Sequence, residues 1–359
     1  MADRDILAIG ASAGGFDALR FLARGFPRDF PASVLMVIHL PAQVPSMLDA
    51  ILTQAGALPA SFAKDGETMK RGHIYIAPQE RHLLIDGDKL QLGCGPRENN
   101  TRPAIDPLMR SVALCCGSRA IGAVLTGTLG DGASGLHALK TCGGIAVVQD
   151  PSDAAFPEMP AAALSRVRPD HVVSLAAMPA LFDKLVREPV GTAKPVPDEI
   201  KYEVEIARSG RATMRNMDHL GRRSVLACPD CHGVMWEIDE GDLVRYRCHV
   251  GHAYTAELLS VSLDENLTRA LGSALRALDE RLALAQRLGD QAREKGLNHV
   301  AQSWAEKAQE FEKEAQVIRR AIQRFDELAV VAEKRQSPHP ANRNPRPAQR
   351  GEGGREAAG

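Results

Sequence analysis

The chain has 359 residues, enough for two or three domains, and its formal net charge of -1 gives no general attraction to nucleic acid or anionic membranes. No stretch approaches the roughly 20 apolar residues of a membrane-spanning helix, so we expect no membrane insertion. The N-terminus has no signal-peptide pattern, and the seven cysteines show no regular disulfide spacing. These features predict a cytoplasmic protein with reduced thiols.

Strands and helices alternate in the first half of the sequence. This alternation is typical of a doubly wound, mostly parallel sheet in a three-layer α/β/α fold. The turn Asp86-Gly87-Asp88 interrupts the alternation and predicts a β-hairpin between His82–Ile85 and Lys89–Leu92. The predicted strands are Ile6–Ile9, Ser33–Ile38, Ile121–Leu125 and Ile145–Val148, and the predicted helices are Phe16–Ala23, Val44–Gln54, Ile105–Cys116, Ala133–Cys142 and Met178–Val186.

The second half is organised differently. A proline-rich stretch predicts a linker, a short segment carries paired Cys and His residues, and apolar stripes at helical spacing predict an antiparallel helical hairpin. The final segment lacks large apolar residues, which predicts disorder. We therefore divide the chain into an α/β domain (1–187), a linker (188–224), a cysteine-bearing module (225–254), a helical hairpin (255–334) and a tail (335–359).

The first predicted strand leads into a glycine-lined turn with one serine at its tip. Gly10-Ala11-Ser12-Ala13-Gly14 matches the G-x-S-x-G pattern of a nucleophile elbow. A nucleophilic serine needs a base and a carboxylate that orients the base. His39 and Asp131 each follow a later predicted strand, and parallel strands present their carboxyl ends at one edge of a sheet. Ser12, His39 and Asp131 are therefore candidates for a catalytic triad.

From the residues alone, a phosphate-binding loop is an equally good interpretation of this turn. Ser12 would then replace the central glycine of the dinucleotide motif, although no acidic residue marks a ribose contact. A histidine after a strand is often structural, and an aspartate before a glycine is often a turn residue or a helix N-cap. The chain order Ser, His, Asp also differs from the order in ordinary α/β hydrolases.

Several segments together resemble the signatures of CheB-type protein-glutamate methylesterases, which decides between these interpretations. They extend over about residues 6–186 and comprise Ile9–Gly15, Val37–Pro41, Gly72–Pro78, His82-Leu83, Arg102–Asp106, Leu125–Gly132, Gln149–Pro151 and Met159-Pro160. The resemblance implies Ser12 as nucleophile, His39 as base and Asp131 as the residue that orients the base. It also implies the backbone amides of Ala13 and Thr128 as oxyanion donors.

The resemblance further implies a reaction and its partners. Such enzymes hydrolyse glutamate γ-methyl esters on chemoreceptor helices through an acyl-enzyme, often deamidate receptor glutamines, and need no cofactor for catalysis. We expect a methylated chemoreceptor or related signalling protein as substrate, and a chemosensory methyltransferase or another signalling protein as a partner. Family members usually carry a receiver domain ahead of the catalytic domain. This sequence begins at the catalytic strand, which predicts a stand-alone enzyme.

Two other functions stay open on the sequence. One is a non-catalytic signalling protein that docks partners through the cysteine-bearing module and the helical hairpin. The other is an esterase of small methyl esters, because Ala13 and Gly130 depart from the residues common in the family and leave substrate choice open. The intact triad candidates favour catalysis over docking.

The cysteine-bearing module predicts a metal site. Cys228 and Cys231 lie three residues apart, and Cys248 and His252 lie four apart, so these four residues can close a tetrahedral Cys3His site. Thiolate and imidazole ligands favour a structural Zn²⁺, and the alternative is a surface segment with free thiols. His252 is preferred to His249 because its Gly-His ending resembles modules that accompany stand-alone methylesterases. Acidic neighbours argue against nucleic-acid binding.

Overall fold

The computed structural model describes residues 4–39, 46–240 and 243–336. The chain divides into two compact units between Leu263 and Asp264. Among the helices in these ranges, none combines the length and apolar character needed to cross a lipid bilayer.

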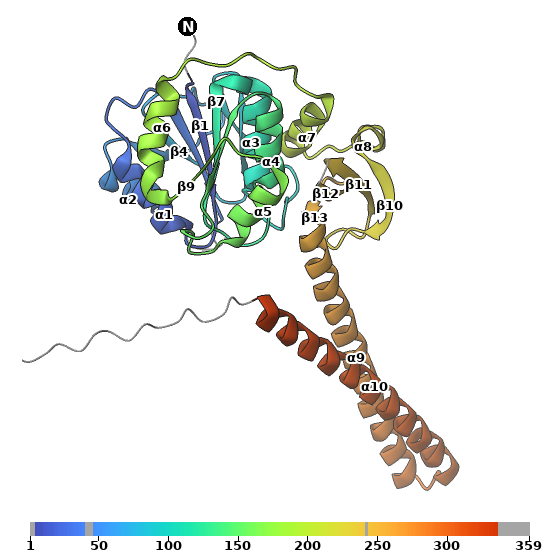
Figure 1. Ribbon diagram of the computed structural model, residues 1–359. Coiled ribbons are helices and arrows are strands. Elements are labelled where there is room, and N and C mark those ends of the chain that lie inside the picture. Colours follow the sequence, from blue (N-terminus) through green and yellow to red (C-terminus); the bar gives the residue numbers. More distant parts are fainter. Residues whose placement is uncertain (1–3, 40–45, 241–242, 337–359) are drawn as a thin grey trace, which may run out of the picture. The chain divides into compact units, whose positions relative to one another are not determined.

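The first unit contains a seven-stranded, fully parallel sheet (Figure 1). Its strands are β1 (Ile6–Ala11), β2 (Ser33–Ile38), β3 (Ala60–Phe62), β4 (Ile74–Ile76), β7 (Ala120–Val124), β8 (Ile145–Gln149) and β9 (His171–Val173). The spatial order β3-β4-β2-β1-β7-β8-β9 places β1 at the centre, between β2 and β7. The carboxyl ends of these three neighbouring strands therefore meet at one edge.

Helices cover both faces of this sheet (Figure 1). On one side lie α1 (Gly15–Gly25), α2 (Leu48–Ala55) and α6 (Met178–Arg187), and on the other lie α3 (Ile105–Cys116), α4 (Ala133–Thr141) and α5 (Glu158–Arg166). Successive side chains of a strand point to opposite faces. In β1, Leu7 and Ile9 pack with α1 and α6, whereas Ile6 and Ala8 pack with α3 and α4. Burial on both faces explains why the central strands read as continuous apolar runs.

The predicted α/β fold is confirmed, together with the hairpin of β5 (His82–Asp86) and β6 (Lys89–Gly93). Sequence periodicity missed β3, β4 and β9, because a strand of three residues is too short to show it. It also missed α5. The helix predicted from Val44 is described from Leu48 onward, and residues 44–45 lie outside the described ranges.

Beyond α6, the same unit contains a small antiparallel sheet with two helices. The helices are α7 (Asp198–Ser209) and α8 (Met214–Leu220), and the strands are β10 (Arg222–Ala227), β11 (Val234–Glu240), β12 (Leu243–Cys248) and β13 (Ala253–Thr255). The linker prediction for 188–224 was therefore wrong beyond residue 197, because α7 and α8 pack Ile206, Met217 and Leu220 against Trp236 of β11. The polar residues of α7 and α8 obscured the apolar residues that they bury. The predicted limits of the cysteine-bearing module, residues 225–254, stay a prediction.

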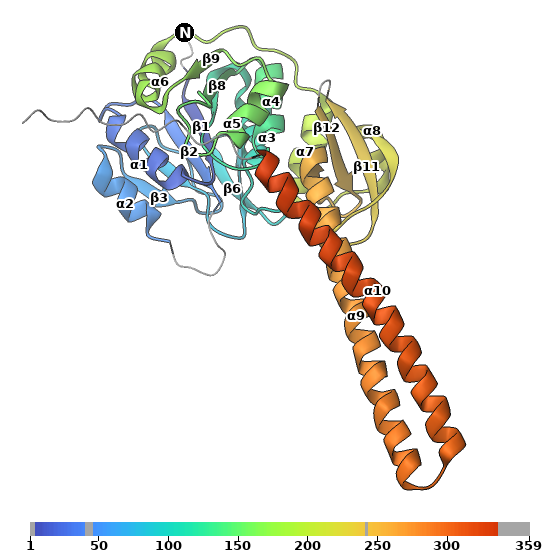
Figure 2. The ribbon, with the colours of Figure 1, turned by 60° about the horizontal axis from the view of Figure 1, so that its bottom comes forward.

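The second unit contains most of α9 (Ala256–Glu294) and α10 (Asn298–Gln336), which run side by side as an antiparallel pair (Figures 1 and 2). Gly296 takes a left-handed φ of 71° in the short connection. Farther along, Arg319 Nη2 lies 2.6 Å from Asp279 Oδ1, and the Arg281 guanidinium lies 4.2 Å from the Phe311 ring centre. The predicted helical hairpin is confirmed. Of the predicted tail, residues 335 and 336 end α10 and the rest lies outside the described ranges.

Candidate active site

Ser12 stands on the turn between the central strand β1 and helix α1. Its amide donates to the Thr126 carbonyl at 3.0 Å, and its own carbonyl accepts from the Gly15 amide at 2.8 Å, so both sides of the turn are fixed. Gly14 has a left-handed φ of 72°, which a residue without a side chain adopts at little cost. The turn therefore leaves the Ser12 hydroxyl half-exposed at the sheet edge.

The structure brings the three triad candidates together from three neighbouring strands. His39, directly after β2, places Nδ1 3.0 Å from Ser12 Oγ. Asp131, in the loop after β7, places Oδ2 2.9 Å from His39 Nε2. For Nδ1 to accept the Ser12 proton, Nε2 must carry the hydrogen and donate it to the carboxylate. The carboxylate of Asp131 selects that tautomer.

Asp131 is held by several donors at the start of helix α3. Its Oδ2 accepts from the Ile105 amide at 2.7 Å, and its Oδ1 accepts from the Asp106 amide at 3.2 Å and from Asn99 Nδ2 at 3.0 Å. Burial raises the pKa of Asp131, but the hydrogen bond and charge of His39 and these N–H donors offset it, so its pKa is lowered. Asp131 therefore stays ionised, as the partner of an imidazolium must.

A second buried carboxyl lies next to the first. Asp106 accepts from the Gly135 amide at 2.7 Å and from Asn99 Nδ2 at 3.0 Å. Burial, followed by the negative charge of Asp131, raises the pKa of Asp106 to about 7. The side-chain amide of Asn99 thus bridges two carboxyl groups that repel each other.

The two predicted oxyanion donors lie on the loops beside Ser12. In the described part of the chain, neither the Ala13 amide nor the Thr128 amide has a protein acceptor, so both are free to meet a substrate oxygen. The carbonyl of Ala13 accepts from Thr126 Oγ1 at 3.0 Å, and the same hydroxyl accepts from the Phe156 amide at 2.9 Å. Thr126 therefore ties the serine turn to the loop that carries Thr128.

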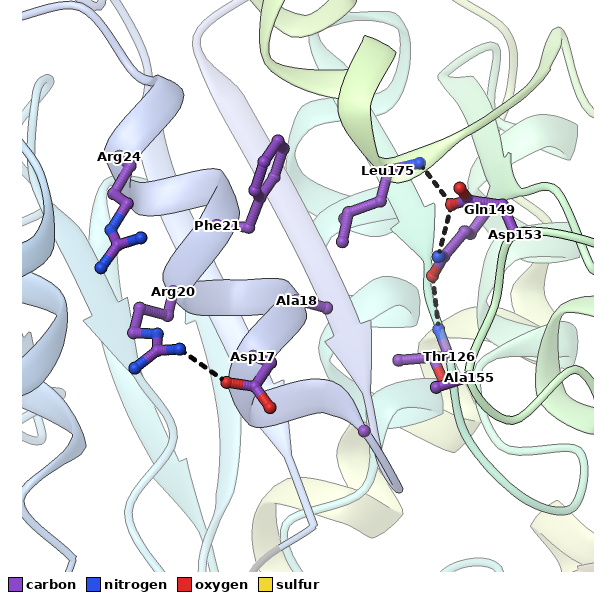
Figure 3. A pocket seen from close by; sticks show the side chains of 11 residues that line it. Asp17, Ala18, Arg20, Phe21, Arg24, Thr126, Gln149, Asp153, Ala155 and Leu175 are labelled. Atoms are coloured by element: carbon purple, nitrogen blue, oxygen red, sulfur yellow. Dashed lines mark hydrogen bonds and ion pairs between the residues drawn. The ribbon is translucent and has the colours of Figure 1, made fainter. Parts of the chain in front are cut away.

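A shallow cavity of about 520 Å³ opens beside the serine turn (Figure 3). Figure 3 shows a chain of hydrogen bonds along one side of this cavity. The Thr126 amide donates to Gln149 Oε1, and Gln149 Nε2 donates to Asp153 Oδ2, both at 2.9 Å. Leu175 and Phe21 give the cavity an apolar part. Neither Ser12 nor His39 lines this cavity, so it is a surface next to the triad candidates and does not contain them.

The predicted metal ligands also converge. One donor atom from each of Cys228, Cys231, Cys248 and His252 lies within 4.8 Å of all the others. His252 Nδ1 is 3.7 Å from Cys228 Sγ and 3.5 Å from Cys248 Sγ. Zinc–sulfur bonds of about 2.3 Å in a tetrahedron separate neighbouring ligands by about 3.7 Å, so the spacing fits Zn²⁺. On the other side of the ring, His252 Nε2 lies 3.9 Å from Asp230 Oδ2, which accepts from the Tyr254 hydroxyl at 2.7 Å.

A buried ionic cluster joins the small sheet to the α/β domain, and sequence reasoning missed it. Arg247 Nη2 lies 3.0 Å from Glu98 Oε1 and 2.9 Å from Glu203 Oε1, while Arg245 Nη1 lies 3.0 Å from Glu203 Oε1. Arg110 of α3 contacts both glutamates. Ionisable side chains alone give no signal of burial, because most of them are exposed.

The part of the chain that carries the triad candidates is similar to known proteins. A family model described as CheB methylesterase matches residues 7–182. A Methanosarcina mazei protein named protein-glutamate methylesterase/protein-glutamine glutaminase 2 is 38% identical over 192 residues, which cover 51% of this chain and 52% of the relative. A Xanthomonas oryzae protein of the same name is 40% identical over 174 residues, covering 47% of this chain and 48% of the relative.

A shorter relative and one solved structure complete the comparison. A Leptospira interrogans protein provisionally given the same two activities is 36% identical over 182 residues, which cover 50% of this chain and 94% of the relative. The crystal structure of the Thermotoga maritima CheB methylesterase catalytic domain is 30% identical, with a TM-score of 0.49, covering 52% of this chain and 100% of that one. The chain thus spans about half the length of the Methanosarcina and Xanthomonas relatives and nearly all of the Leptospira one.

Proposed function

The chain belongs to the CheB methylesterase family, and from that premise we propose that it hydrolyses glutamate γ-methyl esters on chemoreceptor-type proteins. The observation that carries the proposal is the relay from Ser12 Oγ to His39 Nδ1 at 3.0 Å and from His39 Nε2 to Asp131 Oδ2 at 2.9 Å. The Ser12 hydroxyl is half-exposed, as a nucleophile that reaches a substrate must be. The Asp131 carboxylate is buried, which suits a group that orients the base without contacting the substrate.

The first half of the reaction transfers the acyl group to the enzyme. Ser12 Oγ attacks the ester carbonyl carbon while its proton passes to His39 Nδ1. Asp131 stabilises the resulting imidazolium through Nε2. The tetrahedral intermediate then collapses, its bond to the methoxy oxygen breaks, and His39 returns the proton so that methanol leaves. The γ-acyl group stays bonded to Ser12.

The second half releases the product. A water molecule gives its proton to His39 and attacks the acyl carbon, and the proton then returns to Ser12 as the free glutamate side chain leaves. The amides of Ala13 and Thr128 donate to the oxygen that becomes negative in both tetrahedral intermediates. One such donor contributes about 3 kcal/mol to lowering the barrier. The same acyl-enzyme accommodates glutamine deamidation, in which ammonia leaves in place of methanol.

The surroundings of Ser12 support a protein substrate over a small ester. Phe16, Leu129 and Phe156, on the segments beside the serine turn, are 38%, 46% and 41% exposed. Large apolar side chains left exposed around a reacting group are typical of a surface that receives another polypeptide. A small methyl ester would bury little of them, whereas a receptor helix laid across the site would cover them.

The Cys3His cluster supports a structural role for zinc. Cys228, Cys231, Cys248 and His252 would fill a tetrahedral coordination sphere, which leaves no position for a catalytic water. The sheet that carries them has a small apolar cluster, and a metal would add the stability that such a core lacks. We expect one equivalent of zinc per purified chain and its loss in Cys228→Ser.

The partners in this proposal are a methylated chemoreceptor and the chemosensory methyltransferase whose product the enzyme consumes. Zinc binding by Cys228, Cys231 and Cys248 requires reduced thiols, which suits the expected cytoplasmic location. No nucleic-acid partner is proposed.

Methanol release from a methylated receptor fragment tests the function. We expect release by the full chain, a loss of at least about 10⁴-fold in Ser12→Ala, and unchanged release in Ser152→Ala, whose side chain lies on an exposed loop. If neither the full chain nor Ser12→Ala releases methanol, the enzymatic proposal fails. Binding of the fragment without turnover would then favour a docking protein, and turnover of small esters alone would favour a general esterase.

A further inference from the structure

Asn99 lies between the catalytic carboxylate and the metal-binding sheet. It is in the loop between β6 and α3 and is only 5% exposed. Its Nδ2 donates to Asp131 Oδ1 and to Asp106 Oδ2, each at 3.0 Å, so both side-chain N–H groups are used. A side chain that holds a buried catalytic group from behind fixes the orientation of that group.

The other contacts of Asn99 lead to the metal ligands. Its backbone amide donates to the Ala253 carbonyl at 2.8 Å, and its Oδ1 accepts from the Thr255 amide at 3.3 Å. Ala253 is bonded directly to His252, whose carbonyl accepts from the Cys248 amide at 2.9 Å. One peptide bond therefore separates a metal ligand from the residue that pairs with Asn99.

A second contact links the same two segments. Arg247, which is fully buried, donates from Nη1 to the Gly251 carbonyl at 2.8 Å, inside the turn that carries Cys248 and His252. Its Nη2 lies 3.0 Å from Oε1 of Glu98, the residue before Asn99. Both contacts depend on the conformation of one turn, which a bound metal would fix through its ligands.

We propose that Asn99 is a positioning residue for Asp131, and that metal bound by the Cys3His turn holds Asn99 in place. The proposal rests on the esterase and zinc functions proposed above. It makes the rate of the chemical step depend on metal occupancy through residues that touch neither the substrate nor the metal.

The backbone of Asn99 supplies the physical reason for this coupling. Its φ of 51° lies in the left-handed region, which asparagine adopts more easily than most residues but still at a cost, so the contacts of Asn99 help to keep this conformation. Strand β13 has three residues and pairs on one side with β12. When the metal leaves, the turn that carries Cys248 and His252 is no longer held in one conformation. Strand β13, which follows this turn, then shifts, and the Asn99 loop moves away from Asp131.

Two neighbouring asparagines provide a matched pair of variants. Asn100 is also left-handed, with a φ of 61°, but its Nδ2 donates to Ser262 Oγ at 3.2 Å and does not contact the triad. Glycine at either position keeps the backbone conformation and removes the side chain. We expect Asn99→Gly to lower kcat about 10- to 100-fold with KM unchanged, and Asn100→Gly to leave both within about twofold.

The pH profile separates positioning from a general loss of structure. Without the Asn99 donor, the negative charge of Asp131 is less dispersed and favours the imidazolium more strongly. The acid limb of the kcat/KM profile should therefore move to higher pH in Asn99→Gly and keep its position in Asn100→Gly. Equal kcat and equal pH profiles for the two variants would overturn the positioning role.

Metal removal tests the second half of the proposal. The full chain is compared with zinc bound, after chelation, and as Cys228→Ser, with helix content checked by circular dichroism. Chelation should lower kcat about 10-fold or more in the natural sequence and cause no further loss in Asn99→Gly, because the contact through which it acts is already gone. Equal losses in both backgrounds would overturn the route through Asn99.

Hydrogen exchange supplies a readout that needs no activity. Chelation should raise exchange at the Asn99 amide, which donates to Ala253, and leave exchange in β1 unchanged. If methanol release is absent but exchange responds in this way, the proposed function fails and the structural coupling stands. If methanol release is present but neither exchange nor kcat responds to metal, the coupling fails and the esterase stands.

Discussion

Replacing Glu203 by alanine should destabilise the first unit more than any surface substitution. Glu203 lies on α7 with a side chain only 4% exposed. Its Oε1 accepts from Arg245 Nη1 at 3.0 Å and from Arg247 Nη2 at 2.9 Å, and its Oε2 lies 3.6 Å from Arg110 Nε. One carboxylate therefore faces three buried guanidinium groups from both parts of the unit.

The expected magnitude follows from the charges left behind. Without Glu203, the ion pairs that the described residues leave to Arg110, Arg245 and Arg247 are those with Glu98 and Glu240, so two paired carboxylates face three buried guanidinium groups. Breaking a buried ion pair in this way costs about 3–5 kcal/mol of unfolding free energy. Glu203→Gln should lose nearly as much, because it keeps the shape of the side chain and removes the charge.

The pH dependence has a definite sign. Burial raises the pKa of Glu203, but the three guanidinium groups lower it by more than burial raises it. The folded pKa therefore lies below the ordinary value of 4.5. A depressed pKa contributes stability above the unfolded pKa, and this contribution is lost as the pH falls below it. The difference in unfolding free energy between the natural sequence and Glu203→Ala should therefore be largest near pH 7 and should shrink below about pH 4.5.

Urea unfolding followed by tryptophan fluorescence measures this difference. The chain has two tryptophans, and Trp236 is buried in the sheet beside α7, so a Trp304→Phe background isolates the relevant signal. Glu205→Ala is the matched control, because Glu205 is exposed on the same helix. If the unfolding free energies of Glu203→Ala and Glu205→Ala lie within about 1 kcal/mol of each other at pH 7, the reasoning from buried charge is refuted.

Three further predictions concern the catalytic edge. Asp131→Asn should lower kcat for methanol release on the order of 10⁴-fold, because an amide has one oxygen where Asp131 uses two. With that oxygen toward His39 Nε2 and the Ile105 amide, the NH2 group faces the N–H donors of Asn99 and Asp106; with the amide turned round, the NH2 group faces His39 Nε2 and disfavours the required tautomer. Near-normal turnover would contradict this. Thr126→Val removes the hydroxyl that joins the serine turn to the next loop, and should cost about 1–3 kcal/mol in urea unfolding and lower kcat, with KM as the internal comparison. Asp106 has a folded pKa of about 7 against 3.8 unfolded, so its ionisation destabilises the fold increasingly as pH rises between these values, by up to about 4 kcal/mol. Asp106→Asn should therefore gain stability relative to the natural sequence between pH 4 and pH 8 in urea titrations, and parallel pH curves would refute the raised pKa.

The fold class and the candidate site residues could be predicted from the sequence, although the choice of a triad over a phosphate-binding loop depended on the family resemblance. Apolar runs buried on both faces of a sheet, separated by amphipathic helices, specify a parallel α/β fold through local periodicity alone. Ser12, His39 and Asp131 each follow a predicted strand, so their convergence needed only the rule that parallel strands end at one edge. Cys228, Cys231, Cys248 and His252 were equally readable, because ligand spacing is a local property.

How these parts depend on one another became apparent only from their contacts in the folded chain. Asn99 and Glu203 are ordinary polar residues in the sequence, and α7 was interpreted as linker because its many charged residues obscured the apolar residues of its buried face. Their roles come from partners 32 and 42 residues away, at Asp131 and Arg245. Periodicity and motif spacing describe the chain over short distances, whereas hydrogen bonds and charge pairs form between whatever side chains packing brings within about 3 Å.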